Sequence, residues 1–228
     1  MLRRIWVALV LNLAVIAGPV WASDIVAQAV RADTAEEAVS LATGEVLSLI
    51  RAGKEYAADD PERFYTEVES MLRPLIDFPR FARNVMGPYY RQATEAQRER
   101  FAESFKWSLV RTYALALVEF GDGDVAVLPP RKAPKNPNKV NVTQEITYQG
   151  QAYVVVYRMQ RGKELTWRVQ NLVVEGVNVG LNYKSQFASA MKDSKFSGDM
   201  DAVIDAWADV LDAEEESTPA APTEVTPA

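Results

Sequence analysis

The sequence predicts an α+β fold, with a four-stranded antiparallel sheet packed against a set of helices. Apolar residues recur at helical spacing as far as Gly121, and capping residues divide that part into separate helices. Between residues 125 and 174 the pattern changes to the alternation and short turns of β-hairpins. Two further helical stretches follow, and no repeat or internal linker interrupts residues 23–211, so one domain is expected.

The first 22 residues have the features of a signal peptide. Arg3 and Arg4 form a basic start, residues 5–17 are nearly all apolar, and Val20-Trp21-Ala22 is a small-x-small cleavage site. The apolar run is shorter than the roughly 20 residues that span a bilayer. The sequence therefore predicts a cleaved leader at residues 1–22 and export of the mature chain.

Four helices are expected before the strands. Thr34 and Glu37 have the spacing of a capping box at the start of residues 34–50, and Asp60-Pro61 opens a second helix. A short helix ends at Gly87. The longest follows a second capping box at Thr94 and carries a broad aromatic stripe that Gly121 ends. That stripe suits a core helix, or a face that also lines a ligand cavity.

The four predicted strands cover residues 125–128, 140–148, 153–159 and 166–174. Their alternation places Trp167, Val169 and Val173 on one face of the last strand. The proline-rich segment 129–138 is expected to be a loop, because proline cannot donate a ladder hydrogen bond. Helices are expected at residues 181–192 and 200–211.

Two absences restrict the chemistry. The chain contains no His and no Cys. This excludes the Ser-His-Asp triad, every cysteine nucleophile and the common zinc sites. Carboxylate catalysis stays open, but no pair of acids is singled out, and neither a cofactor nor a metal site is expected.

The charge is acidic, and it is concentrated at the C-terminal end. Removing Arg3 and Arg4 leaves 23 basic and 31 acidic residues, and five of those acids lie in residues 212–228. That Pro/Thr/Ala-rich tail has no periodicity, so it is expected to be disordered. The body is nearly balanced in charge, whereas a nucleic-acid-binding domain would be basic.

Two short motifs resemble sites without matching them. Gly176, Gly180 and Lys184-Ser185 outline a phosphate loop, but the spacing departs from Gly-x-x-x-x-Gly-Lys-Ser/Thr. The preferred interpretation is that the two glycines let the chain turn from a strand into a helix. A Ser/Lys catalytic dyad is also disfavoured, because adjacent helical residues such as Lys184 and Ser185 do not face each other. The "GDGD" of residues 121–124 lacks the further ligands of a calcium loop.

Apolar residues are in excess over what one sheet face needs. The strand "AYVVVYRM" is apolar on both faces. A tight core or an apolar cavity between sheet and helices would each account for this excess, and the pattern does not separate them.

Two segments carry a resemblance to a known family. They are "GPYYRQATEAQRERFAESFKWSLVRTYALALVEF" at residues 87–120 and "WRVQNLVVEGVNVGLNYKSQF" at residues 167–187. The chain resembles the MlaC, or toluene-tolerance auxiliary, family of periplasmic phospholipid-binding proteins over residues 39–207. The resemblance implies a curved sheet with helices, a nuclear-transport-factor-like core with added helices, enclosing an apolar pocket.

The resemblance also implies a function. It is that of a periplasmic carrier that takes phospholipid as its bound ligand and maintains outer-membrane lipid asymmetry. The implied partners are an outer-membrane lipoprotein–porin complex and an inner-membrane ABC transporter, contacted through its MCE-domain subunit. A monomer is expected. Rival interpretations are a periplasmic chaperone or carrier for lipoproteins or apolar polypeptide, and an enzyme that acts through carboxylates.

The expected lipid-contacting residues are the apolar and aromatic side chains of the predicted faces. They are Val85, Met86, Tyr90, Phe105, Leu109, Tyr113, Leu117, Val142, Val154, Val156, Trp167, Val169 and Val173. If the strands pack the other way round, the neighbours of these residues line the pocket instead.

Overall fold

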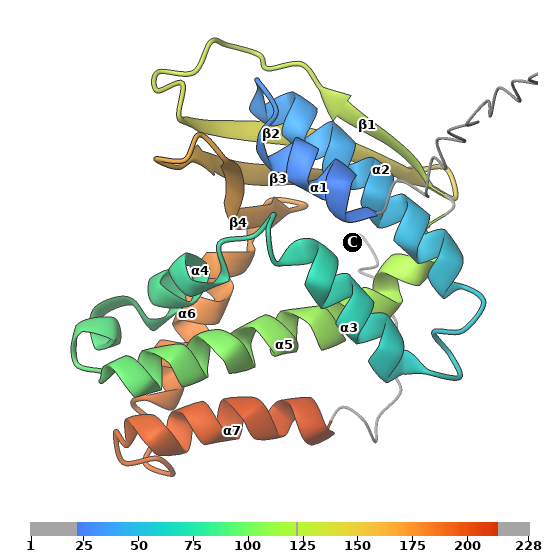
Figure 1. Cartoon of the computed structure of the whole chain (residues 1–228). Helices are drawn as coiled ribbons and strands as arrows, with labels where there is room; N and C mark the ends of the chain where they lie inside the picture. The colour runs from blue at the N-terminus through green and yellow to red at the C-terminus, as the bar shows by residue number, and fades with distance from the viewer. Residues whose placement is uncertain (1–21, 122, 214–228) are drawn as a thin grey trace, which may run out of the picture.

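The computed structural model describes residues 22–121 and 123–213 as helices packed against one antiparallel sheet (Figure 1). The predicted leader, except Ala22, and the predicted tail, except Asp212 and Ala213, lie outside the described residues. Helices α1 (Ala22–Val30) and α2 (Ala35–Gly53) lie across one face of the sheet. The long α5 (Glu95–Phe120) runs below it, between α3 (Pro61–Leu72) and α7 (Met200–Ala213) (Figure 1). Among the described helices, none is long and apolar enough to cross a membrane.

The sheet has five strands rather than the predicted four, in the order β1-β2-β3-β4-β5. Their bounds are Asp124–Leu128, Lys139–Tyr148, Gln151–Arg161, Trp167–Val174 and Val177–Asn178. The additional strand β5 is two residues long and pairs with the end of β4. Such a short strand leaves no alternation for sequence reasoning to detect. The α+β class is confirmed, whereas the nuclear-transport-factor-like core stays a prediction.

A β-bulge changes which residues of β4 share a face. Arg158 pairs with Asn171, but the next residue, Met159, pairs with Val169, so that Gln170 is the extra residue. An extra residue shifts the alternation by one. Leu172 therefore joins Trp167 and Val169, and the prediction that Val173 shares their face is wrong.

The helices before the strands begin at capping residues, of which the sequence predicts Thr34 and Asp60. Helix α2, Ala35–Gly53, starts after Thr34, whose hydroxyl accepts from the Glu37 amide at 3.1 Å. Helix α3, Pro61–Leu72, follows the Asp60 cap. Helix α4, Phe78–Met86, follows Asp77 and ends at Gly87, whose φ of 56° suits glycine. Local sequence thus sets these boundaries. The sequence did not predict helix α1, Ala22–Val30, or the 3₁₀ helix Gly87–Arg91.

Helix α5, Glu95–Phe120, carries the capping box that its sequence predicts. The Thr94 hydroxyl accepts from the Gln97 amide, and the Gln97 side chain accepts from the Thr94 amide. Helix α6 is Val179–Ala190. Helix α7, Met200–Ala213, extends two residues past the predicted end of the domain.

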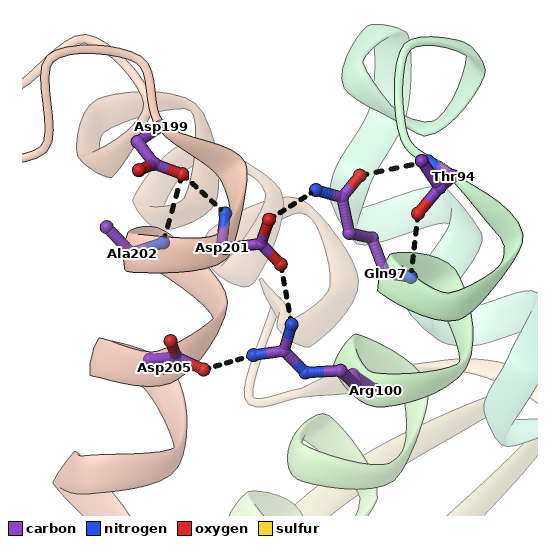
Figure 2. A network of polar contacts seen from close by, with 7 residues as sticks. All are labelled: Thr94, Gln97, Arg100, Asp199, Asp201, Ala202 and Asp205. Atoms are coloured by element: carbon purple, nitrogen blue, oxygen red, sulfur yellow. Dashed lines mark hydrogen bonds and ion pairs between the residues drawn. The ribbon is translucent and has the colours of Figure 1, made fainter.

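A polar network joins α7 to the first turns of α5 (Figure 2). The Gln97 side chain donates to Asp201 at 2.8 Å, and Arg100 pairs with both Asp201 and Asp205. Asp199 accepts from two backbone amides at the start of α7. Gln97 therefore serves both the cap of α5 and the attachment of α7.

Buried apolar side chains form several clusters, and two of them lie next to the sites described below. The first, the helical cluster, joins α4, α5, α6 and α7 and contains Phe81, Ala82, Val85, Met86, Ala93, Phe101, Phe105, Tyr183, Phe187, Met191, Val203 and Ile204. The second, the sheet cluster, contains Ala32, Ala35, Ala38, Val39, Val142, Met159, Trp167 and Val169. Ile76 packs against both clusters.

Candidate functional site

The first half of the α5 stripe is closed by aromatic packing. Phe101 and Phe105 are fully buried. Phe105 meets Phe81 and Tyr183 edge-on, with ring centroids 5.2 and 5.3 Å apart, and Phe101 meets Phe187 at 4.8 Å. Such edge-to-face pairs add to the free energy of simple area burial. Three predicted contact residues, Val85, Met86 and Phe105, belong to this closed helical cluster.

The second half of the same stripe is open. Leu109 and Leu117 are half-buried, and Tyr113 is 46% exposed. The Tyr113 and Tyr183 hydroxyls are 3.5 Å apart, which places Tyr113 beside α6. The backbones of α2, α3, α4 and α7 pack on α5, and α6 contacts it through the rings of Tyr183 and Phe187. These three predicted contact residues thus form a partly exposed apolar row along α5.

The sheet face toward α2 holds three more predicted contact residues. Val142, Trp167 and Val169 are buried in the sheet cluster. The indole N–H of Trp167 is buried and has no hydrogen-bond partner, and it is the only such side-chain group among the described residues. A buried donor left unpaired costs about 1–3 kcal/mol. This donor would gain from an acceptor brought by a ligand.

A polar chain crosses that face. Gln144 is buried; its amide donates to the Thr43 hydroxyl at 2.7 Å and accepts from the Tyr157 hydroxyl at 2.8 Å. Burial raises the pKa of Tyr157 to about 12. Tyr157 therefore stays a neutral donor, and the chain fixes α2 against β2 and β3 without placing a charge inside.

The remaining predicted strand residues point to the opposite face. Val156 and Val173 are cross-strand neighbours there and are half-buried, and Val154 is 37% exposed. Tyr90 is half-buried and packs against the helical cluster, with Arg98 stacked on its ring at 4.4 Å. The thirteen predicted residues are therefore divided between two closed clusters, an open row on α5 and both faces of the sheet.

A pocket of about 570 Å³ opens on this second face, between α4, α6 and strands β2 to β4. Its lining includes Arg80, Lys139, Arg158 and Lys184, and it includes no carboxylate. Sequence reasoning missed it because the four cations come from four elements. One signal was available: Arg158 interrupts the apolar run of the third strand.

Gly180 of the rejected phosphate motif lines this pocket, and Gly176 lies in the turn that precedes it. Glu175 and Gly176 have φ of 49° and 78° and form the turn from β4 to β5. A Cβ on Gly180 would come within 2.5 Å of the Asn171 side chain and 3.0 Å of Phe81. The Asn171 side chain also accepts from the Gly180 amide at 2.9 Å. The predicted role of these glycines in the passage from strand to helix is confirmed.

Metal chemistry has no candidate among residues 22–121 and 123–213, where no group of three acidic side chains is placed to hold an ion. Asp122 of the "GDGD" segment lies outside the described residues.

Comparisons with known proteins agree with one another. The model of the MlaC protein family matches residues 41–209. The toluene tolerance protein ttg2D of Pseudomonas putida is 35% identical over 182 residues, covering 78% of this chain and 82% of that protein. The intermembrane phospholipid transport system binding protein MlaC of Haemophilus influenzae is 26% identical over 141 residues, covering 60% of this chain and 65% of that protein.

A solved structure shares the fold. The phospholipid-binding protein from Ralstonia solanacearum, determined in complex with a phospholipid, superposes with a TM-score of 0.71 at 27% identity. The match covers 79% of this chain and 98% of that one. The family model spans most of the chain, and the first relative exceeds 30% identity over most of its length. From this agreement we conclude that the chain belongs to the MlaC family.

Proposed function

We propose that this chain is a periplasmic phospholipid carrier that shuttles lipid between outer-membrane and inner-membrane complexes. The observation that carries the proposal is the fold shared with the Ralstonia protein, which is described in complex with a phospholipid and is covered over 98% of its length. The Haemophilus relative, named for intermembrane phospholipid transport, supports the same role. The lipoprotein–porin complex and the ABC transporter with its MCE-domain subunit are the proposed partners.

The physical task of such a carrier is to shield acyl chains from water. Each CH₂ group removed from water contributes about 0.8 kcal/mol. A carrier therefore needs apolar surface that its own fold does not fill. No reaction is required, so the proposal is for a binding protein and not an enzyme.

We assign the acyl chains to the side of α5 that carries Leu109, Tyr113 and Leu117. These side chains are apolar or aromatic and are partly exposed, so a bound chain would gain contact area there. Phe105 and Val142, which are enclosed within the two clusters, would contact lipid only if the clusters opened. The thirteen-residue lining therefore stays a prediction, and the α5 row is its most accessible part.

Native mass spectrometry of the purified mature chain, followed by organic extraction, tests the proposal. We expect about one phospholipid per chain. A chain that stays empty after incubation with phospholipid vesicles would contradict carriage of lipid. A co-purified polypeptide in place of lipid would favour the rival carrier of apolar polypeptides.

A charge placed in the α5 row tests the assignment of the acyl site. Leu117→Arg should abolish lipid retention, because a guanidinium is costly to bury against acyl chains. Thr112→Arg is the matched control, since Thr112 is an exposed residue of the same helix. Circular dichroism establishes that both variants fold. Normal retention by folded Leu117→Arg would place the acyl chains elsewhere.

A further inference from the structure

The pocket on the second face of the sheet has the charge of an anion site. Arg80, Lys139, Arg158 and Lys184 line it, from α4, β2, β3 and α6 respectively. In the described part of the chain none of the four forms an ion pair, whereas Arg63, Arg73, Arg100, Lys106 and Arg111 all do. Four like charges around one cavity repel each other, and a bound anion relieves that repulsion.

The sheet register sets the donors of the pocket in a row. Asn141 pairs with Arg158, and Arg158 pairs with Asn171, so that three polar side chains lie side by side across β2, β3 and β4. Directly opposite residues have Cβ atoms about 5 Å apart. Arginine presents a planar fork that matches two oxygens of a phosphate, and the neighbouring Asn141 amide can supply a further donor.

The N-terminus of α6 forms part of the wall but does not supply the donors. Asn178 caps α6 by accepting from the Leu181 amide at 3.0 Å, and Asn171 accepts from the Gly180 amide at 2.9 Å. These two amides are therefore already used. The helix contributes its positive end as a field, and the hydrogen bonds to a ligand come from side chains.

The floor of the pocket favours a ligand with an apolar part. Phe81, in the helical cluster, and Met159, in the sheet cluster, both line it. The pocket therefore lies where the two clusters meet, below a rim of cations. An ionic group attached to hydrocarbon fits this order better than an ion alone.

We propose that this pocket binds a phosphate group, carried as the phosphodiester of a glycerophospholipid or free as inorganic phosphate. In its lipid form the site rests on the proposed function and adds a headgroup contact to it. Arg158 and Lys184 are the residues that we expect to hold the phosphate oxygens.

The test compares two double variants of the full mature chain. Arg158→Ala/Lys184→Ala removes two pocket cations. Lys163→Ala/Lys192→Ala removes the same charge at exposed residues outside the pocket. All four side chains are exposed, so both variants should unfold thermally as the wild type does. One assay is titration with inorganic phosphate at low ionic strength. The other is uptake of phosphatidylglycerol from vesicles, compared with diacylglycerol of the same acyl chains.

For a headgroup site, the wild type takes up phosphatidylglycerol in preference to diacylglycerol. In the pocket variant the ratio of phosphatidylglycerol uptake to diacylglycerol uptake falls about tenfold, and in the control variant this ratio is unchanged. For a free-phosphate site, inorganic phosphate binds the chain that still holds its co-purified lipid. The pocket variant then binds phosphate about tenfold more weakly, with lipid uptake unchanged.

A pocket variant equal to the control in both assays overturns the proposal. If lipid is still taken up, only the proposed phosphate site is wrong, and the proposal that the chain carries lipid is kept. If no lipid is taken up by any form, the carrier fails, and the phosphate titration still decides the pocket by itself.

Discussion

The two halves of α5 carry one continuous apolar stripe but occupy different environments. In the first half, Phe101 and Phe105 are fully buried among rings from α4, α6 and α7. One and three turns further on, Leu109 and Leu117 are half-buried, and Tyr113 between them is 46% exposed. The helix itself is regular throughout, so the difference comes from what lies opposite each half.

This difference separates stability from binding. A ring whose partners belong to the same fold contributes to folding whether or not a ligand is present. An apolar side chain that is only partly covered contributes less to folding, and it leaves free energy to be gained when a ligand covers it. The closed half of α5 is therefore expected to determine stability, and the open half is the proposed acyl site.

The largest expected effect comes from removing a ring of the closed half. Phe105→Ala should lower the free energy of unfolding by about 3–5 kcal/mol, since it loses burial and leaves a cavity between Phe81 and Tyr183. Urea unfolding followed by circular dichroism measures the change. A loss below about 1 kcal/mol would mean that the helical cluster is not closed in solution.

The next effect concerns the buried ion pair that joins α3 to α5 where the two halves meet. Glu69 is buried and pairs with Lys106 at 2.9 Å, and Arg73 donates to it at 2.9 Å. Glu69→Gln should cost about 2–3 kcal/mol, because the charge of Lys106 loses a buried partner. Glu103→Gln, at the exposed end of the same network, is the control and should cost less.

The same pair predicts a dependence on pH. Hydrogen bonds from Arg73 hold the pKa of Glu69 below its ordinary value of 4.5. A lowered folded-state pKa stabilises the protein above the unfolded pKa, and this contribution is lost as the pH falls through the lower folded value. Between neutral pH and pH 4.5 the cost of Glu69→Gln should therefore be constant. Below 4.5 it should shrink, as unfolding at a series of pH values will measure; a cost that grew below 4.5 would contradict the lowered pKa.

A smaller effect is expected from truncation in the open half. Leu117→Ala should lower the free energy of unfolding by about 1 kcal/mol, because water already reaches part of this side chain. The measurement is made on chain that has been stripped of lipid, with Phe105→Ala alongside. Equal losses at the two positions would remove the distinction between the halves.

The smallest effect is expected at the surface network that attaches α7 to the closed half (Figure 2). Arg100, Asp201 and Asp205 have side chains between 46% and 61% exposed. Exposed pairs contribute little and are screened by salt, so Arg100→Ala should cost about 0.5 kcal/mol. Thermal unfolding at low and high salt measures this, and a larger loss that is insensitive to salt would show a packing role for Arg100.

Sequence reasoning recovered the elements whose signals are local. The Thr94 cap and the Asp60-Pro61 start lie where the structure has them, because a cap is decided by a few neighbouring residues. The two-residue β5 was missed because it has no pattern of its own. Val173 was assigned to the wrong face because a bulge depends on how two strands pair, and neither strand records this alone.

For the candidate sites, too, some features follow from the sequence and others only from the tertiary structure. The sequence by itself determined the α+β class, the apolar stripe of α5, the lack of histidine and cysteine chemistry, and the family resemblance that the comparisons confirmed. Only the tertiary structure decided which part of the stripe is closed, and that Arg80, Lys139, Arg158 and Lys184 surround one pocket. The physical reason is range: caps and periodicity act within a few residues, whereas burial and the meeting of charges depend on segments that folding brings together from far apart in the chain.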